Sequence, residues 1–283
     1  MKNILIIGAN GQLGKALRAR YPDATAVDRD DFDMTDWNML SGYDWSKVDT
    51  IINAAGYTNV DGAEMAEGRE AAWKINSSSP GYLSRLAGQH NLALVHISTE
   101  YVFDGTKDNH KEDEPFTPLG VYAQSKAAGD IAVSVAPKHY ILRSSWLVGD
   151  GANFVRTMIN LAEKNISPKV VSDQIGRLTF TKTVVDVIDH ILTTKASYGT
   201  YNVSNDGEPV SWAEVARAVY KQLGRDDLTV TDITSIEYFA DKPAAAPRPL
   251  LSTLDLTKIK QAGYTPRDWR EDLREYIRKE TSK

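Results

Sequence analysis

Short apolar runs alternate with helical stretches along the first half of the chain, and this alternation limits the folds open to it. The helical stretches lie near 11–21, 70–91 and 125–136. The apolar runs are bounded by polar residues or glycine and lie at 3–9, 24–28, 49–56, 93–99 and 139–149. Such runs are typical of buried strands in a parallel sheet, and helices between them form right-handed crossovers. The alternation therefore predicts an α/β fold with a doubly wound parallel sheet.

The pattern loosens after Gly149, where we expect a second, smaller part of the molecule. Amphipathic helical patterns recur at 153–165 and 211–224, and the segment 199–205 has the character of a strand. We expect a dinucleotide-binding Rossmann domain and a smaller α/β lobe that binds the substrate. The domain is expected to span 1–148, with 170–205 partly returning to it. The lobe is expected to span 149–169 and 206–283.

Composition and charge exclude several kinds of partner and site. The formal net charge of −5 gives no basic field, so neither nucleic acid nor a membrane is an expected partner. The sequence has no cysteine, which excludes disulfides and thiolate metal sites. Its five histidines show no metal-ligand spacing, so we expect no metal. The first apolar run ends too early for a signal peptide, and a cytoplasmic protein is expected.

A glycine-rich turn follows the first predicted strand. Gly8, Gly11 and Gly14 form a G-x-x-G-x-x-G pattern at the start of the first predicted helix. Glycines in such a turn let the backbone approach a pyrophosphate, which sits on the helix N-terminus. Asp28 ends the second predicted strand, at the position of an acid that binds the adenosine ribose hydroxyls. We therefore predict a dinucleotide site.

The sequence leaves the choice between NADH and NADPH open. The acidic side chain of Asp28 favours NAD, whereas the guanidinium of the adjacent Arg29 can accept the 2′-phosphate of NADP. Small residues after the third predicted strand allow the backbone to contact the cofactor closely. The residues expected at the cofactor are Gly8, Asn10, Gly11, Gln12, Leu13, Gly14, Asp28, Arg29, Ala54, Ala55 and Gly56.

A tyrosine and a lysine stand four residues apart, as Tyr122 and Lys126, in a stretch that favours a helix. This spacing places both side chains on one helix face. Taken alone, the pair also fits an exposed lysine lying over an aromatic ring. Thr99, however, ends the fourth predicted strand, at the edge where open α/β sheets build their sites. We therefore predict a catalytic group made of Thr99, Tyr122 and Lys126.

Together these motifs resemble those of the extended short-chain dehydrogenases/reductases. Further phrases narrow the resemblance to the dTDP-4-dehydrorhamnose reductases within that class, over nearly the whole chain: "STEYVFDG", "NAAGYTNVDGAE", "SSWLVG", "DQIGRLTFT" and "RPLLSTLD". The resemblance implies reduction of the 4-keto group of a nucleotide-sugar, dTDP-4-dehydro-L-rhamnose (dTDP-4-keto-6-deoxy-L-mannose), with NADPH or NADH. It also implies a monomer or weak homodimer.

The resemblance assigns roles to the catalytic group. Lys126 would hold the nicotinamide ribose, and its charge would favour the phenolate of Tyr122. Tyr122 would protonate the developing alkoxide, and Thr99 would hydrogen-bond the substrate oxygen. Both Tyr122 and Lys126 therefore count among the cofactor-binding residues as well.

The resemblance also implies contacts to the rest of the substrate. Thr58, Val60 and Trp146 would line the sugar site, although Trp146 at a strand end fits a core aromatic equally well. The segments around Arg177 and Arg248 would reach the nucleotide diphosphate.

Two other interpretations share much of this pattern. A nucleotide-sugar dehydratase or epimerase has the same turn, tyrosine and lysine, but a dehydratase carries an acid pair where this chain has Glu100 followed by Tyr101. A non-catalytic regulatory subunit, resembling that of methionine adenosyltransferase, shares the fold, but the intact catalytic group favours an enzyme. Three residues depart from the reductase pattern: Glu100 replaces aspartate, Leu178 replaces proline and Leu251 replaces asparagine.

Overall fold

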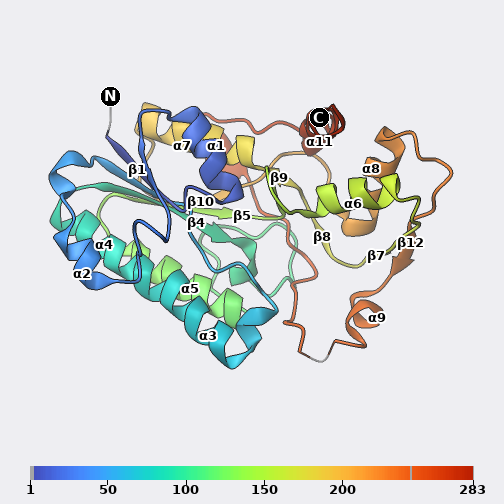
Figure 1. Cartoon of the computed structure of the whole chain (residues 1–283), viewed down its shortest axis with the longest axis horizontal. Helices are drawn as coiled ribbons and strands as arrows, with labels where there is room; N and C mark the ends of the chain where they lie inside the picture. The colour runs from blue at the N-terminus through green and yellow to red at the C-terminus, as the bar shows by residue number, and fades with distance from the viewer. Residues whose placement is uncertain (1–2, 243, 283) are drawn as a thin grey trace.

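A central parallel sheet organises the larger part of the molecule (Figure 1). The computed structural model describes residues 3–242 and 244–282, and six strands of these residues form the sheet. In order across the sheet they are β2 (Thr25–Val27), β1 (Ile4–Ile7), β3 (Thr50–Asn53), β4 (Ala93–Thr99), β5 (His139–Ser144) and β10 (Gly199–Val203). The strand order reverses beside β1, as it does in doubly wound folds, so the predicted fold class is confirmed.

Helices cover both faces of the sheet because its strands are apolar on both sides. Ile6 packs with Leu17 and Val184 in one buried cluster, whereas Leu5 and Ile7 belong to another on the opposite face. The first face is covered by α1 (Gln12–Arg20) and α7 (Thr181–Thr194), which pack on each other. The helices of the second face are α2 (Trp37–Gly42), α3 (Ala66–Trp73), α4 (Ser79–Gln89) and α5 (Val121–Ser134), with a π-helical turn at Lys74–Ser78.

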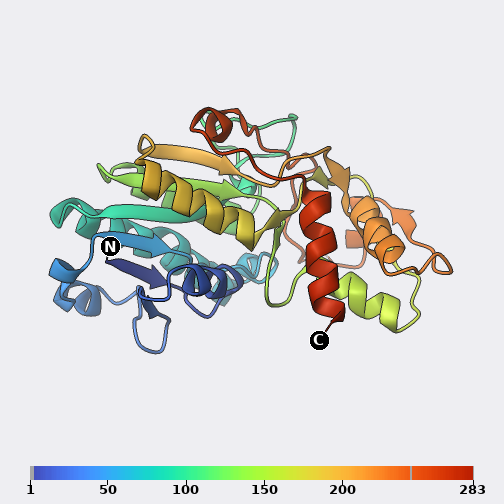
Figure 2. The same cartoon turned by 90° about the horizontal axis from the view of Figure 1, so that it is seen from above.

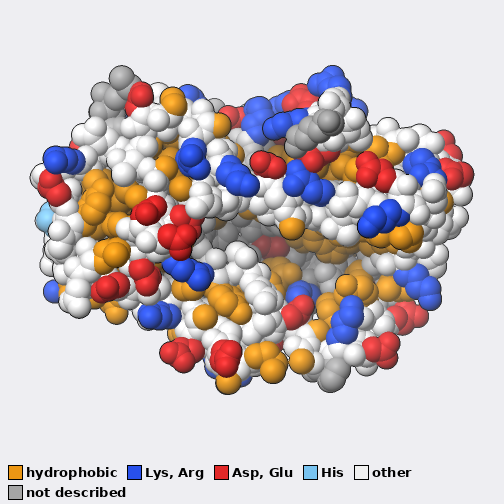
Figure 3. Space-filling view, viewed as in Figure 1, with side chains coloured by type: hydrophobic (Ala, Val, Ile, Leu, Met, Phe, Trp, Pro, Cys, Tyr) orange, Lys and Arg blue, Asp and Glu red, His pale blue; other side chains and the backbone are white. Residues whose placement is uncertain are grey.

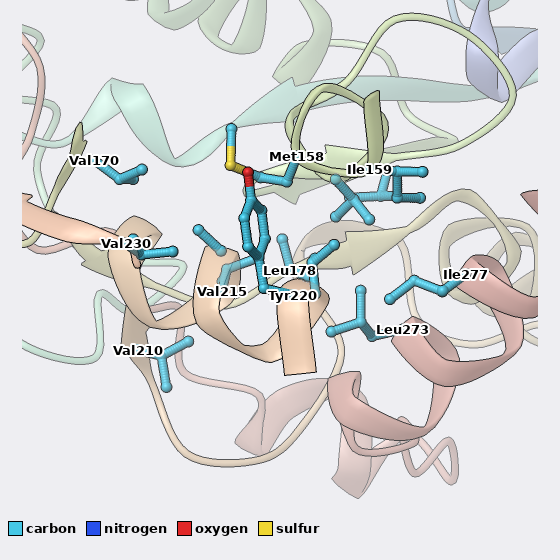
Figure 4. Close-up of a cluster of buried hydrophobic side chains, with 14 of the residues drawn as sticks. Met158, Ile159, Val170, Leu178, Val210, Val215, Tyr220, Val230, Leu273 and Ile277 are labelled. Atoms are coloured by element: carbon cyan, nitrogen blue, oxygen red, sulfur yellow. The ribbon is translucent and has the colours of Figure 1, made fainter. Parts of the chain in front are cut away.

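The smaller lobe has its own buried core. Met158, Leu178, Val215 and Leu273 meet there from segments far apart in the sequence (Figure 4). The lobe helices are α6 (Phe154–Glu163), α8 (Trp212–Gln222), α9 (Ser235–Phe239) and α11 (Trp269–Thr281). Its short strands pair as β7 (Lys169–Val171) with β12 (Thr231–Ile233), β8 (Ile175–Gly176) with β11 (Val210–Ser211), and β6 (Leu147–Val148) with β9 (Thr179–Phe180). Figure 2 shows α11, in red, between the sheet and the rest of the lobe.

The run 139–149, expected as one strand, is divided in the structure. β5 ends at Ser144, and β6 pairs with β9 instead of continuing in the main sheet. Trp146 lies between them with a φ of 39°, a left-handed conformation that residues other than glycine seldom adopt. The chain therefore turns out of the sheet at Trp146.

The packing mixes segments from both expected domains. Leu256 and Ile259 lie in the range expected for the lobe, yet they pack in the cluster under β10 and α7. Ile259 belongs to α10 (Thr257–Gln261), which contacts β10. The assignment of 149–169 and 206–283 to substrate binding stays a prediction. Among the helices described, none has the length and apolar character needed to cross a membrane.

Candidate active site

The carboxyl ends of the strands open into a cleft of about 530 Å³ between the sheet and the lobe. Figure 3 shows this face hollowed near its middle, with acidic and basic side chains intermingled around the hollow. Open α/β sheets bind ligands in such a crevice, where the strand order reverses. The structure brings most of the predicted site residues into the lining of the cleft: Gly8, Gly11, Gln12, Leu13, Asp28, Arg29, Ala54, Ala55, Gly56, Thr58, Val60, Thr99, Tyr122, Lys126 and Trp146.

The glycine turn fits a bound pyrophosphate. Gly8 has a φ of 84°, and a Cβ there would lie 2.6 Å from the backbone nitrogen of Ala55. A Cβ on Gly14 would lie 2.1 Å from the Gly8 carbonyl oxygen, so Gly14 permits close packing of α1 rather than lining the cleft. In the described chain, no side chain caps α1 at Gly11 and its first turn holds no acid. The N-terminal N–H groups of α1 are therefore open to an anion.

Asp28 ties the end of β2 to the glycine turn. Its carboxylate accepts hydrogen bonds from the backbone N–H groups of Asn10 and Arg29, each at 2.8 Å. Both oxygens keep acceptor capacity for ribose hydroxyls. The exposed Arg29 side chain lies at the same edge of the cleft, while Asn10 contributes through its backbone. The geometry therefore fits the adenosine ribose of either cofactor.

Thr99, Tyr122 and Lys126 converge on the cleft from two elements. Thr99 ends β4, and the other two lie in the first turns of α5. The Tyr122 ring packs edge-on against Tyr101, with ring centroids 5.8 Å apart. Lys126 Nζ donates to the carbonyl oxygen of Ile97 at 2.6 Å. A hydroxyl, a phenol and an amino group thus face one crevice, where they can hold and protonate a carbonyl oxygen.

Burial controls the ionisation of this group. It lowers the pKa of Lys126 to about 8, although the negative charge of Asp130 opposes the shift. Burial also raises the pKa of Tyr122, and a negative charge on Glu100 would raise it further. The sequence predicted the opposite direction for Tyr122, from the Lys126 charge. Loss of hydration dominates because the phenol is enclosed, so Tyr122 keeps its proton at neutral pH, as a proton donor must.

Several residues that line the cleft were missed by the sequence prediction. They are Phe32, Asp33, Met34, Thr35, Ser144, Ser145, Tyr101 and Trp212, together with Glu100, which had been noted only as a departure. Phe32 to Thr35 follow Asp28 at the end of a strand, and Glu100 follows Thr99, so position alone could have indicated them. No local signal indicated Trp212.

Trp146 satisfies both expectations for it in part. Its half-buried ring lines the cleft and also packs against the lobe core. Trp212 of α8 stacks on this ring, with centroids 3.6 Å apart and planes 16° apart. A Cβ on Gly176 would lie 2.9 Å from the ring, so glycine is needed opposite. The left-handed backbone of Trp146 is thus held by packing on two sides.

The two arginines expected at the diphosphate do not line the cleft. Arg177 Nε donates to the Gly207 carbonyl oxygen at 2.7 Å, and its Nη1 donates to that of Leu254 at 3.1 Å. Arg248 forms an ion pair of 2.7 Å with Asp61, which joins the lobe to the loop after β3. An arginine side chain donates to the acceptors that the fold brings near it, and the sequence alone does not show where those acceptors lie. A role for either arginine at the nucleotide stays a prediction.

The two leucines that depart from the reductase pattern do not line the cleft. Leu178 is fully buried in the lobe core. Leu251 acts through its backbone, donating to the Gly105 carbonyl oxygen and accepting from His110 Nε2. Neither side chain therefore bears directly on the chemistry of the cleft.

Known proteins resemble this chain over nearly its whole length. The family model described as RmlD substrate binding domain matches residues 1–282. The dTDP-4-dehydrorhamnose reductase of Aggregatibacter actinomycetemcomitans is 39% identical, over 97% of this chain and 98% of that protein. The crystal structure of a dTDP-4-dehydrorhamnose reductase from Clostridium acetobutylicum has a TM-score of 0.89 at 35% identity and covers 98% of both chains. The same enzyme from Bacillus anthracis, in complex with NADP, has a TM-score of 0.89 at 32% identity and covers 99% of both.

Proposed function

Because this chain belongs to the RmlD substrate binding domain family of extended short-chain dehydrogenases/reductases, we propose that it reduces dTDP-4-dehydro-L-rhamnose to dTDP-L-rhamnose. It is an oxidoreductase, and its cofactor is NADPH or NADH. The observation that best supports carbonyl reduction is the meeting of Thr99, Tyr122 and Lys126 at a cleft whose glycine turn fits a dinucleotide. The relatives compared above are named as reductases, which favours this function over a dehydratase or a regulatory subunit.

Each residue of the catalytic group has its own role in carbonyl reduction. When bound, the reduced nicotinamide supplies the hydride to the keto carbon. Thr99 donates a hydrogen bond to the keto oxygen, and Tyr122 gives its proton to the alkoxide that develops there. Lys126, whose Nζ lies 2.6 Å from the Ile97 carbonyl oxygen of β4, would bind the nicotinamide ribose. Thr99 and Lys126 are buried and Tyr122 is half-buried, which limits the access of water and strengthens each of these interactions.

The function is tested by incubating the purified full chain with the keto-sugar and either NADPH or NADH. We expect loss of cofactor absorbance in step with formation of dTDP-L-rhamnose, identified by chromatography against a standard. dTDP-glucose, which has no keto group, serves as the control and should support no oxidation. Absence of turnover with both cofactors would refute the proposed function.

The cofactor preference follows from the edge of the cleft at β2. Arg29→Ala should weaken the use of NADPH by about tenfold, because one charged hydrogen bond to a 2′-phosphate is lost at an exposed site. Asp28→Ala should weaken the use of NADH, since its carboxylate faces the ribose and also fixes the turn at Asn10. The measurement is the ratio of kcat/KM for the two cofactors in each variant. An unchanged ratio in both would mean that neither side chain contacts the ribose.

We infer that the stacked Trp146 and Trp212, which both line the cleft, lie on its sugar side. Trp212→Ala should raise the KM for the keto-sugar roughly 3- to 10-fold, because Trp146 loses the ring that supports it. The cofactor KM should stay unchanged, since Trp212 enters from the lobe. Trp212→Phe keeps an aromatic face and should restore most of the affinity. Equal effects on the KM of both ligands would contradict this placement.

A further inference from the structure

Glu100 is a buried carboxyl group in the wall of the cleft to which the catalytic scheme gives no role. It follows Thr99 directly and opens the 3₁₀ turn Glu100–Val102. Its side chain is almost fully enclosed, with 3% of the residue exposed. Its Oε2 lies 2.8 Å from Thr99 Oγ1 and shares a hydrogen bond with it. Ionising a carboxyl group in such a place is costly, and its protonation state decides which atom donates in this hydrogen bond.

Counting protons at the Thr99 hydroxyl shows what Glu100 decides. A threonine hydroxyl has one proton to donate and two lone pairs to accept with. One lone pair already accepts the backbone N–H of Tyr101 at 3.2 Å. If Glu100 is a carboxylate, it takes the single Thr99 proton, and none remains for a substrate oxygen. If Glu100 is a neutral acid, it donates to the second lone pair, and the Thr99 proton is free to point into the cleft.

We propose that Glu100 is a positioning residue that acts as a neutral carboxylic acid, donating to Thr99 so that the Thr99 hydroxyl donates to the keto oxygen. This inference rests on the proposed reduction for its effect on rate. The hydrogen-bond arrangement itself belongs to the free protein and can be measured without substrate.

The surroundings of Glu100 support the neutral form. Burial raises its pKa to about 8, so the acid keeps its proton at neutral pH and loses it as the pH rises through that value. The titratable groups around it are Tyr101 on its own turn and Tyr122 on α5, both neutral because burial raises their pKa values. Lys126 on α5 lines the same cleft, but its Nζ bonds to a backbone carbonyl. Arg248, whose positive charge lowers the pKa of Tyr101, forms an ion pair with Asp61.

The neutral form also suits the proton donor beside it. A charged Glu100 would raise the pKa of Tyr122 still further and would resist the negative charge that develops on the substrate oxygen. A neutral Glu100 removes both effects. One side chain thus keeps Thr99 correctly oriented and keeps the crevice free of negative charge.

The first test compares pH profiles of kcat/KM in the wild type and Glu100→Gln. The amide of glutamine donates to Thr99 at every pH, so this variant should stay within about threefold of the wild type at pH 7. The wild type should lose activity as the pH rises through about 8, the value to which burial raises the pKa of Glu100. Glu100→Gln should lose the contribution of Glu100 to this alkaline limb, which becomes less steep. Glu100→Leu, which has no donor, should be roughly 10- to 100-fold slower at pH 7.

The alkaline limb has a second possible source, and the same experiment separates the two. The pKa of Lys126 is also lowered to about 8, and its deprotonation would produce a limb that persists in Glu100→Gln. A limb with the same midpoint and steepness in the wild type and Glu100→Gln, or a Glu100→Leu variant as active as the wild type, would overturn the proposal.

The second test needs no turnover. Infrared difference spectra of wild type against Glu100→Gln should show, at pH 7, the carbonyl stretch of a protonated carboxyl group that disappears in alkaline solution. The matched control is Glu70→Gln, which removes an exposed carboxylate on α3 and should show no such band. Finding Glu100 ionised at pH 7 would overturn the proposal. This result stands even if the keto-sugar is not the substrate, so failure of the inference and failure of the proposed function are distinct.

Discussion

Tyr122→Phe is expected to lower turnover by about 10²-fold or more while leaving cofactor binding intact. The substitution removes the phenolic proton and keeps the ring, whose edge-on packing against Tyr101 does not depend on the hydroxyl. Because the pKa of Tyr122 is raised, the wild-type residue holds its proton throughout the neutral range, and the variant has no substitute for it. Single-turnover rates with the keto-sugar, together with titration of the cofactor by fluorescence, measure the two quantities separately.

A control for Tyr122→Phe is available on the surface. Tyr198→Phe makes the same chemical change at a tyrosine that is 48% exposed and remote from the cleft, and it should leave turnover unchanged. Wild-type turnover in Tyr122→Phe would remove Tyr122 as the proton donor.

Lys126→Met is expected to impair both turnover and cofactor binding, because one amino group serves two purposes. Methionine keeps most of the length of the side chain but cannot donate, so we expect the cofactor Kd to rise roughly 10- to 100-fold, the equivalent of one charged hydrogen bond. Asp130 keeps its 3.0 Å ion pair with Arg143, so the variant should not leave the buried charge of Asp130 without a partner. Isothermal titration of each cofactor gives the Kd directly.

The matched control for this variant is Lys47→Met. Lys47 lies on the surface, with its side chain 83% exposed, and the change should not affect the Kd. An unchanged Kd in Lys126→Met would show that Lys126 does not bind the ribose and would limit its role to the chemistry.

Features that depend on neighbours in sequence were predictable here. The apolar run Leu5, Ile6 and Ile7 predicts a strand with two buried faces. In the structure these side chains pack into clusters on opposite sides of the sheet. Tyr122 and Lys126 share a helix face because of their spacing, and Thr99 reaches them because it ends a strand at the open edge of the sheet. Local periodicity and strand order thus suffice to gather the catalytic group.

Features that depend on distant contacts were not predictable. Nothing near Trp212 in the sequence indicates that it will stack on Trp146, because that contact requires α8 to meet a turn beside the main sheet. The same holds for Arg177, whose donors go to backbone carbonyls from two separate loops. The ionisation of Tyr122 was predicted in the wrong direction because sequence supplies the nearby charge but not the degree of enclosure.

The lobe core also has a consequence for the newly made chain. The ribosome releases β1 to β5 early, so most of the nucleotide half can assemble while synthesis continues. The lobe core cannot form in the same way, because it is completed by Trp269 and Leu273 of α11. α6 precedes α11 by more than a hundred residues, and α8 precedes it by about fifty. During that interval the apolar faces of α6 and α8 remain in contact with water. This is the stage at which we expect a chaperone to bind, and at which slow translation of the last helix would favour aggregation.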